Sequence, residues 1–166
     1  MLTPHLPRLH LLLYSTLLGT ELFQTFILTK VSFHALPRSA FITLQKRLFP
    51  VYFRAQTLLL VLTAATLPLS RLLVPVDAVL FTVAGATAVR NLVVYEPRTR
   101  GAVGGGTAQE RRDSAAREGG DSAVREEVKR LKREFSWNHA MTIHLNLVSV
   151  GAMLVYGWRL GGRLAL

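Results

Sequence analysis

Apolar residues of the 166-residue chain gather in four long blocks, and polar residues gather between them. The blocks cover about residues 9–29, 51–70, 74–95 and 138–158. A helix needs roughly 20 mostly apolar residues to cross the hydrocarbon core of a bilayer, and each block has that length. A helix of a water-soluble bundle carries a polar face, whereas these blocks have no charged face. The pattern therefore predicts four transmembrane helices.

The first block also has a feature of a cleaved secretory signal, because Arg8 precedes its apolar run. Signal peptides have apolar runs of roughly 7 to 15 residues that end at a small-x-small cleavage site. The run here is longer, and no such site ends it convincingly. We therefore expect an uncleaved first span, with a cleaved signal as the alternative.

Pro37 and Pro50 bracket a short segment between the first two blocks. Its apolar residues Phe41, Leu44 and Leu48 recur at helical spacing, and its charged residues fall elsewhere. This pattern is typical of an amphipathic helix that lies flat in the headgroup region. An irregular loop is the alternative.

The connection between the third and fourth blocks, residues 96–136, is the only clearly hydrophilic stretch. Its glycine-rich part, residues 99–120, has the composition of a flexible loop insert. From Asp121 onward, apolar residues recur at helical spacing. We therefore predict a juxtamembrane helix that begins near Asp121 and continues into the fourth span.

Lys and Arg are distributed unevenly over the connections. The two longer loops contain fourteen of them, whereas the other ends of the spans contain four. The positive-inside rule therefore places both longer loops in the cytoplasm and both termini in the lumen or outside the cell. No retention, lipidation or targeting signal identifies the organelle.

The net charge of +10 would ordinarily direct attention to nucleic acid. The topology already accounts for the excess, and aromatic residues do not alternate with basic ones as in a nucleic-acid module. We therefore expect no nucleic-acid partner.

Four basic residues just before the last span form a candidate patch for anionic lipids: Lys129, Arg130, Lys132 and Arg133. Each would contribute about 1 kcal/mol to binding of an anionic bilayer surface. The alternative is a solvated helix face that only fixes the topology.

Several polar residues interrupt the spans, and ionisable groups inside a membrane call for partners. At about 1.5 Å of rise per residue, Glu21 lies roughly 13 Å from the cytoplasmic end of its helix at Lys30, and Arg90 about 9 Å from Glu96. Because successive spans reverse direction, these depths coincide. We therefore predict one intramembrane polar layer, formed by Glu21, Gln24, Gln56, Arg90, Asn91, His144 and Asn146.

Two interpretations of this layer remain open. In the structural one, Glu21 and Arg90 form a buried ion pair and the amides join the helices, at about 0.6 to 2 kcal/mol per contact. In a variant of it, Arg90 extends to the interface and Glu21 is protonated. In the functional one, Glu21 and His144 relay protons or cations along a transport path.

Catalytic and metal-binding patterns are missing from the sequence. The chain has no Cys, which excludes disulfides, thiol catalysis and cysteine-ligated metals. No nucleophile triad, phosphate loop or HExxH motif occurs. We therefore expect no enzyme activity, no cofactor and no metal site.

Three stretches carry a family resemblance. Ala35-Leu36-Pro37-Arg38 and residues 44–53 precede and open the second span, Glu96-Pro97-Arg98-Thr99 closes the third, and residues 135–139 lead into the fourth. In order and spacing they resemble the transmembrane protein 205-like family, and Glu21 looks like its fungal variant. The resemblance covers residues 9–158 except the glycine-rich loop. It implies a single four-span domain over residues 1–166, with no established enzymatic activity.

The residues of these stretches at the span ends form a candidate interfacial motif: Pro37, Arg38, Gln45, Lys46, Arg47, Pro50, Glu96, Pro97 and Arg98. Arg38 and Arg98 would meet lipid phosphates, and Glu96 would pair with either of them.

These observations together predict an all-α integral membrane four-helix bundle with an interfacial amphipathic helix and a cytoplasmic juxtamembrane helix. The function we expect first is a structural or interaction component of its membrane, in contact with the lipid bilayer and able to form a homo-oligomer. The alternative is a small transporter or channel-like component that uses Glu21, Arg90 and His144.

Overall fold

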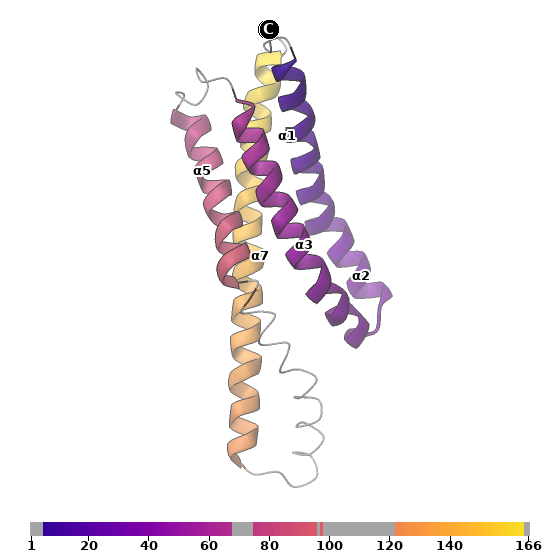
Figure 1. The fold of residues 1–166 in the computed structure, drawn as a ribbon. Helices are drawn as coiled ribbons and strands as arrows, with labels where there is room; N and C mark the ends of the chain where they lie inside the picture. Colours follow the sequence, from indigo (N-terminus) through magenta and orange to yellow (C-terminus); the bar gives the residue numbers. More distant parts are fainter. Residues whose placement is uncertain (1–4, 68–74, 96, 98–121, 165–166) are drawn as a thin grey trace.

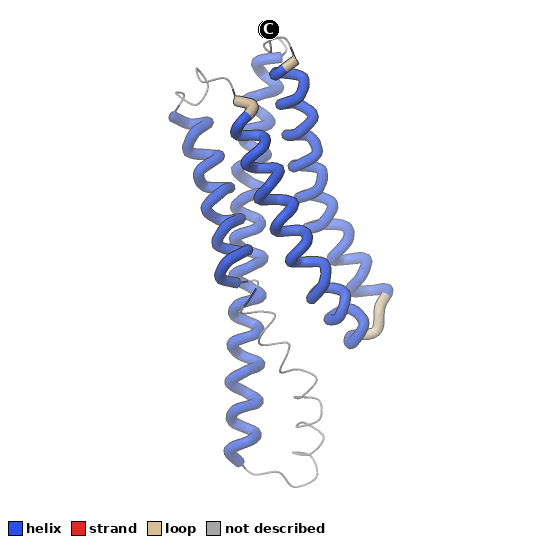
Figure 2. Tube along the Cα trace, in the orientation of Figure 1, coloured by secondary structure: helices blue, strands red, loops and turns tan. Residues whose placement is uncertain are grey.

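A computed structural model of the chain describes residues 5–67, 75–95, 97 and 122–164. Within these ranges the chain is helical and contains no strand (Figure 2). The elements are α1 (Leu6–Leu22), η1 (Phe23–Leu28), α2 (Thr29–Ala35), α3 (Arg38–Ala65), α5 (Pro75–Arg90), η2 (Asn91–Tyr95) and α7 (Ser122–Leu164), of which η1 and η2 are π-helical.

The four predicted spans are confirmed as helices that are long and apolar enough to cross a membrane. They comprise Leu6–Ala35, Ser39–Ala65, Pro75–Tyr95 and Ser136–Arg163. In the first, α1, η1 and α2 follow one another without a break. Figure 1 shows α1 beside α3, and α5 beside α7.

The last helix is far longer than a membrane requires. With 43 residues at about 1.5 Å of rise each, α7 is roughly 64 Å long, about twice the thickness of the hydrocarbon core. Its first part extends beyond the other helices (Figure 1). The prediction that the juxtamembrane helix continues into the fourth span is therefore confirmed, whereas the predicted insert at 99–120 lies outside the described residues.

The segment between Pro37 and Pro50 is helical as predicted, but it is not a separate interfacial helix. α3 begins directly after Pro37 and continues through Pro50 to Ala65. Between α2 and α3, Leu36 and Pro37 are extended; Leu36 is extended because a residue that precedes proline avoids the helical conformation. A proline inside a helix removes one backbone hydrogen bond, and membrane helices tolerate it where neighbouring groups compensate. The prediction that Pro50 ends this helix is therefore wrong.

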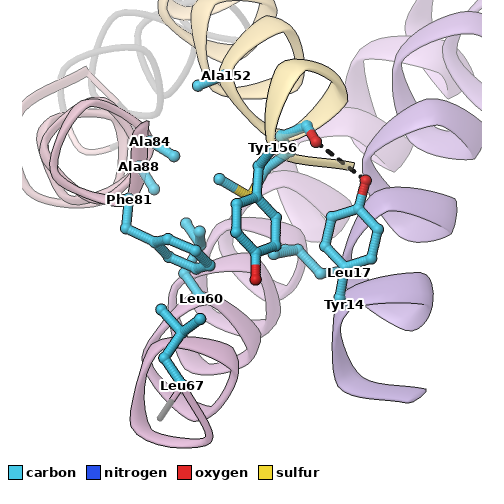
Figure 3. Close-up of a cluster of buried hydrophobic side chains, with 10 residues drawn as sticks. Tyr14, Leu17, Leu60, Leu67, Phe81, Ala84, Ala88, Ala152 and Tyr156 are labelled. Atoms are coloured by element: carbon cyan, nitrogen blue, oxygen red, sulfur yellow. Dashed lines mark hydrogen bonds between the residues drawn. The ribbon is translucent and has the colours of Figure 1, made fainter. Parts of the chain in front are cut away.

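A cluster of apolar and aromatic side chains from α1, α3, α5 and α7 fills the interior of the bundle (Figure 3). Its buried members are Tyr14, Leu17, Leu60, Leu67, Phe81, Ala84, Ala88, Ala152, Met153 and Tyr156. The ring of Tyr156 lies at the centre, with its centroid 5.4 Å from that of Tyr14 and 4.8 Å from that of Phe81, both edge to face. Such aromatic pairs contribute beyond their buried area, so this cluster holds all four spans together.

Gly157 on α7 makes room for one member of this cluster. A methyl group at this position would collide with the hydroxyl of Tyr14. That hydroxyl donates a hydrogen bond of 3.0 Å to the Met153 carbonyl oxygen (Figure 3). The absence of a side chain at Gly157 thus lets Tyr14 contact the backbone of α7.

Candidate functional site

Glu21 lies at the meeting point of three spans and is fully buried. Its Oε1 atom accepts a 2.6 Å hydrogen bond from Gln56 Nε2 on α3 and a 2.9 Å hydrogen bond from Ser149 Oγ on α7. The carboxyl group therefore joins α1, α3 and α7 through two direct side-chain contacts.

A second group of polar side chains continues from this point. Tyr52 donates a 2.7 Å hydrogen bond to Asn146 Oδ1, and Asn146 Nδ2 donates one of 2.7 Å to Thr25 Oγ1. Gln56 Nε2 connects the two groups, at 3.2 Å from Ser149 Oγ and 3.5 Å from Asn146 Oδ1. We call this network the Glu21 layer; it consists of Glu21, Thr25, Tyr52, Gln56, Asn146 and Ser149.

Three of these six residues belong to the predicted polar layer, namely Glu21, Gln56 and Asn146, and the structure brings them together. Sequence reasoning missed Thr25, Tyr52 and Ser149. Each lies one helical turn from a predicted member, at spacings of four, four and three residues. Side chains three or four residues apart share a helix face, so this spacing is the signal that identifies them.

Arg90 does not join the layer, and the predicted Glu21–Arg90 ion pair is wrong. The Arg90 side chain is exposed, and its guanidinium carbon lies 5.8 Å from the centroid of the Tyr95 ring. A guanidinium group gains from contact with an aromatic face, and long basic side chains near the end of a span reach the interface. These two effects direct Arg90 away from Glu21.

His144 is also outside the layer, contrary to the prediction. It is exposed, and its Nδ1 atom lies 2.6 Å from the Ala140 carbonyl oxygen of the same helix. Two residues correspond to roughly 200° of rotation around a helix with 3.6 residues per turn. Because Asn146 faces the interior, His144 faces outward.

The two remaining members of the predicted layer, Gln24 and Asn91, are buried but form no hydrogen bond with the residues of the Glu21 layer in the described part of the chain. Gln24 contacts Thr29 of the same span, with 3.5 Å between Nε2 and Oγ1. Asn91, in η2, donates a 3.2 Å hydrogen bond to the Thr142 carbonyl oxygen of α7. Asn91 therefore joins the third span to the fourth.

Thr25 comes from η1, where the helix widens by one residue per turn. The Thr29 backbone N–H correspondingly bonds the Gln24 carbonyl, five residues earlier. π-Helical turns occur frequently at functional sites. η1 begins two residues after Glu21, so it adjoins the centre of the Glu21 layer.

Not every buried polar atom is paired. Among the side chains that the structure describes, the buried atoms without a hydrogen-bond partner are Glu21 Oε2, Gln56 Oε1, Asn91 Oδ1 and both amide atoms of Gln45. A buried polar atom left unpaired costs about 1 to 3 kcal/mol. Two of these atoms belong to the Glu21 layer, which distinguishes it from a fully satisfied packing contact.

The predicted interfacial motif is described only in part, so it stays a prediction. Gln45 is buried, Lys46 is half-buried and Arg47 is exposed, all on α3. Pro37 directly precedes α3, Pro50 lies inside α3, and Pro97 is exposed. The side chain of Arg38 and the residues Glu96 and Arg98 lie outside the part of the chain that the structure describes.

The predicted lipid patch lies on the part of α7 that extends beyond the bundle. Lys129 is 3.7 Å from Glu126, and Arg130 is 3.7 Å from Glu134; all four side chains are exposed. Arg133 is exposed as well, and the side chain of Lys132 is not among those that the structure describes. Exposed pairs of this kind contribute at most about 1 kcal/mol, so lipid headgroups can compete for these basic groups.

His10 forms a second buried polar contact, which the sequence did not predict. Its Nδ1 atom lies 3.1 Å from the Thr63 carbonyl oxygen and 2.9 Å from Thr66 Oγ1, and its Nε2 atom lies 2.6 Å from the Tyr156 hydroxyl. A carbonyl oxygen only accepts hydrogen bonds, so these partners assign the hydrogen to Nδ1. Nε2 then accepts from Tyr156, and His10 joins α1 to α3 and α7.

Asp77, in the first turn of α5, is fully buried between two arginines of α7. Arg159 Nε donates to Oδ1 and Arg163 Nη1 donates to Oδ2, each over 2.8 Å. In the sequence analysis these two arginines are among the four basic residues counted at the other ends of the spans, and no partner was predicted for them. The pair fastens the start of α5 to the end of α7, and an acid in the first turn also stabilises its own helix.

The described residues contain no group of three or more His, Asp or Glu side chains that could hold a metal ion. Their chemistry is that of helix-joining hydrogen bonds and one buried ion-pair cluster inside four apolar helices. This combination defines an all-α, multi-pass integral membrane protein.

The chain belongs to the family of the domain of unknown function DUF4149, whose profile matches residues 12–106. It is also similar to "Xanthocillin biosynthesis cluster protein D" of Aspergillus fumigatus, with 37% identity over 164 residues. That alignment covers 93% of this chain and 88% of the relative. No solved structure matches the chain. The comparisons therefore identify a membrane domain of unknown function, and they do not show the transmembrane protein 205-like family.

Proposed function

We propose that this protein is a structural or interaction component of its membrane and that it catalyses no reaction. The observation that carries the proposal is the closure of the bundle at the Glu21 layer, where three spans are joined by direct side-chain hydrogen bonds. A relay path would use Arg90 and His144, and both face away from this layer. The purified protein can be assayed against hydrolase and transferase substrates. Turnover of any of them would contradict the proposal.

The part of α7 beyond the bundle supports an interaction role. A helix this long is not needed to cross the bilayer, and its described acidic and basic side chains are exposed. We propose that it meets anionic lipid on the cytoplasmic side. Binding of phosphatidylserine-containing vesicles to the protein held in nanodiscs of neutral lipid tests this contact; equal binding of neutral vesicles would contradict it.

Self-association is part of the same proposal. Gly19, Gly85 and Gly151 have open space where a Cβ atom would lie, so a helix of a second copy can approach these positions closely. Light scattering of the protein in detergent measures the mass of the assembly. A strictly monomeric mass in detergent and in nanodiscs would contradict a homo-oligomer.

We further propose that the longer loops face the cytoplasm and that both termini lie on the opposite side, as the distribution of Lys and Arg favours. Selective labelling of a cysteine placed at Ser136 or at His5 distinguishes the two sides. We also propose that the family resemblance to the transmembrane protein 205-like proteins reflects the same four-span fold. A solved structure of such a protein with another span order would contradict it.

The similar Aspergillus protein is named for a biosynthesis cluster. We propose that the present chain likewise accompanies a biosynthetic pathway as a membrane component. Deletion of its gene, followed by mass spectrometry of the secreted and retained metabolites, tests this assignment. An unchanged metabolite profile would contradict it.

The transporter interpretation keeps one supporting observation, which is the unpaired Glu21 Oε2 atom. Flux in proteoliposomes separates it from the structural interpretation. We expect proton and sodium flux through vesicles with the protein to equal that of empty vesicles, because the spans close directly on one another. Flux that the wild-type chain supports and Glu21→Gln abolishes would overturn the structural proposal.

A further inference from the structure

Three oxygen atoms surround the side-chain nitrogen of Gln56. They are Glu21 Oε1 at 2.6 Å, Ser149 Oγ at 3.2 Å and Asn146 Oδ1 at 3.5 Å. An amide nitrogen has two hydrogens, so it cannot satisfy three acceptors at once. The carbonyl oxygen of the same side chain is buried and has no hydrogen-bond partner among the described residues. A half-turn of the Gln56 amide would exchange the two atoms and gather four oxygens at one point.

The charge of this site is not balanced by the surrounding side chains. Glu21 is fully buried, and no Lys, Arg or His of the described residues forms an ion pair with it. Its second oxygen, Oε2, has no hydrogen-bond partner there either. A buried carboxyl group is stable either when it is protonated or when a positive charge compensates it, and a proton on Oε2 would find no hydrogen-bond acceptor among the described residues. Because the site has a single carboxylate, one unit of positive charge neutralises it.

We propose that the Glu21 layer binds one small monovalent metal cation, of which Na⁺ is the test case. Glu21, Ser149 and Asn146 supply three oxygens, and Gln56 supplies the fourth by turning its carbonyl inward. Hard cations take oxygen ligands of this kind, namely carboxylate, amide carbonyl and hydroxyl. The cation remains enclosed and binds the three spans together.

Two further residues act as positioning residues for this site. The Tyr52 hydroxyl donates to Asn146 Oδ1, and Thr25 Oγ1 accepts from Asn146 Nδ2. These contacts fix the Asn146 amide with its oxygen toward Gln56. Thr25 belongs to the π-helical η1, and π-helical turns occur frequently at functional sites.

Thermal unfolding of the full chain in detergent micelles tests the proposal at constant pH and ionic strength, with NaCl exchanged for choline chloride. We expect Na⁺ at about ten times its dissociation constant to raise Tm by roughly 3 to 6 °C. Glu21→Gln abolishes this rise because it removes the only carboxylate. Ser149→Ala removes one ligand and should shift the midpoint of the rise to higher Na⁺ concentration. This variant replaces Glu21→Gln as the test if Glu21→Gln does not fold.

Gln24→Leu is the matched control, because Gln24 is buried in the same span but lies outside the layer. It should retain the full Na⁺-dependent rise. A wild-type Tm that is equal in NaCl and choline chloride would overturn the proposal, as would a rise that persists in both Glu21→Gln and Ser149→Ala. The cation site does not depend on the structural role proposed above: transport flux would overturn that role alone, and an absent Na⁺ effect would overturn the site alone.

Discussion

Replacement of Asp77 by Asn is expected to lower the free energy of unfolding by about 3 kcal/mol, because removal of the buried carboxylate leaves two half-buried arginines without their opposite charge. Asp77 is completely buried, and the side chains of Arg159 and Arg163 are only 31% and 25% exposed. Unfolding of the purified variant in detergent, followed by circular dichroism, measures the loss.

Glu126→Gln is the matched control for Asp77→Asn, since it breaks an ion pair in which both side chains are more than two-thirds exposed. An exposed pair contributes little, so this variant should lose less than about 0.5 kcal/mol. Equal losses in the two variants would contradict the buried pair between α5 and α7.

The second large effect is expected at Gln56. Gln56→Leu removes the 2.6 Å donor to Glu21 and leaves the buried carboxyl group with Ser149 alone, at an expected cost of about 2 to 3 kcal/mol. In the double variant Glu21→Leu, Gln56→Leu, the unpaired carboxyl group is also absent. The loss in the double variant should therefore be smaller than the sum of the single losses by at least about 1 kcal/mol. Equilibrium unfolding of all four proteins measures this coupling.

The same cycle on Glu21 and Arg90 provides the comparison. Because Arg90 contacts Tyr95 and faces outward, Glu21→Gln and Arg90→Gln should be additive within about 0.5 kcal/mol. Strong coupling between Glu21 and Arg90, with additivity between Glu21 and Gln56, would restore the ion pair that the sequence predicted and contradict the Glu21 layer.

The spans were predictable because hydrocarbon thickness imposes a length on every apolar helix. The continuity of α7 was predictable as well, since apolar residues recur at helical spacing up to the fourth span. The continuation of α3 through Pro50 was not predictable, because a single proline indicates a helix boundary and only packing decides whether the helix continues. The π-helical turns likewise depend on tertiary contacts that no local pattern records.

The candidate site shows the same division. Depth along a span follows from residue number, so Glu21, Gln56 and Asn146 were placed at one level. Direction around a helix requires a known interior face, and without it Arg90 and His144 were assigned to the layer. The contacts of Asp77 with α7 were not predicted, because an acid at the start of a helix also has a local role. A single His10 within an apolar run likewise gives no sign in the sequence that its partners are on two other spans.

Water access to Ser149 tests the central claim, a bundle closed at the Glu21 layer, most directly. The chain contains no Cys, so a single Ser149→Cys variant in oriented proteoliposomes can be treated with a membrane-impermeant thiol reagent from each side. Ser136→Cys, at an exposed position of α7, is the folded control, and both variants unfolded in detergent give full labelling. The closed bundle predicts that Ser136→Cys reacts and Ser149→Cys reacts from neither side. Reaction of Ser149→Cys from one side would show that water reaches Glu21 and would contradict the closed bundle.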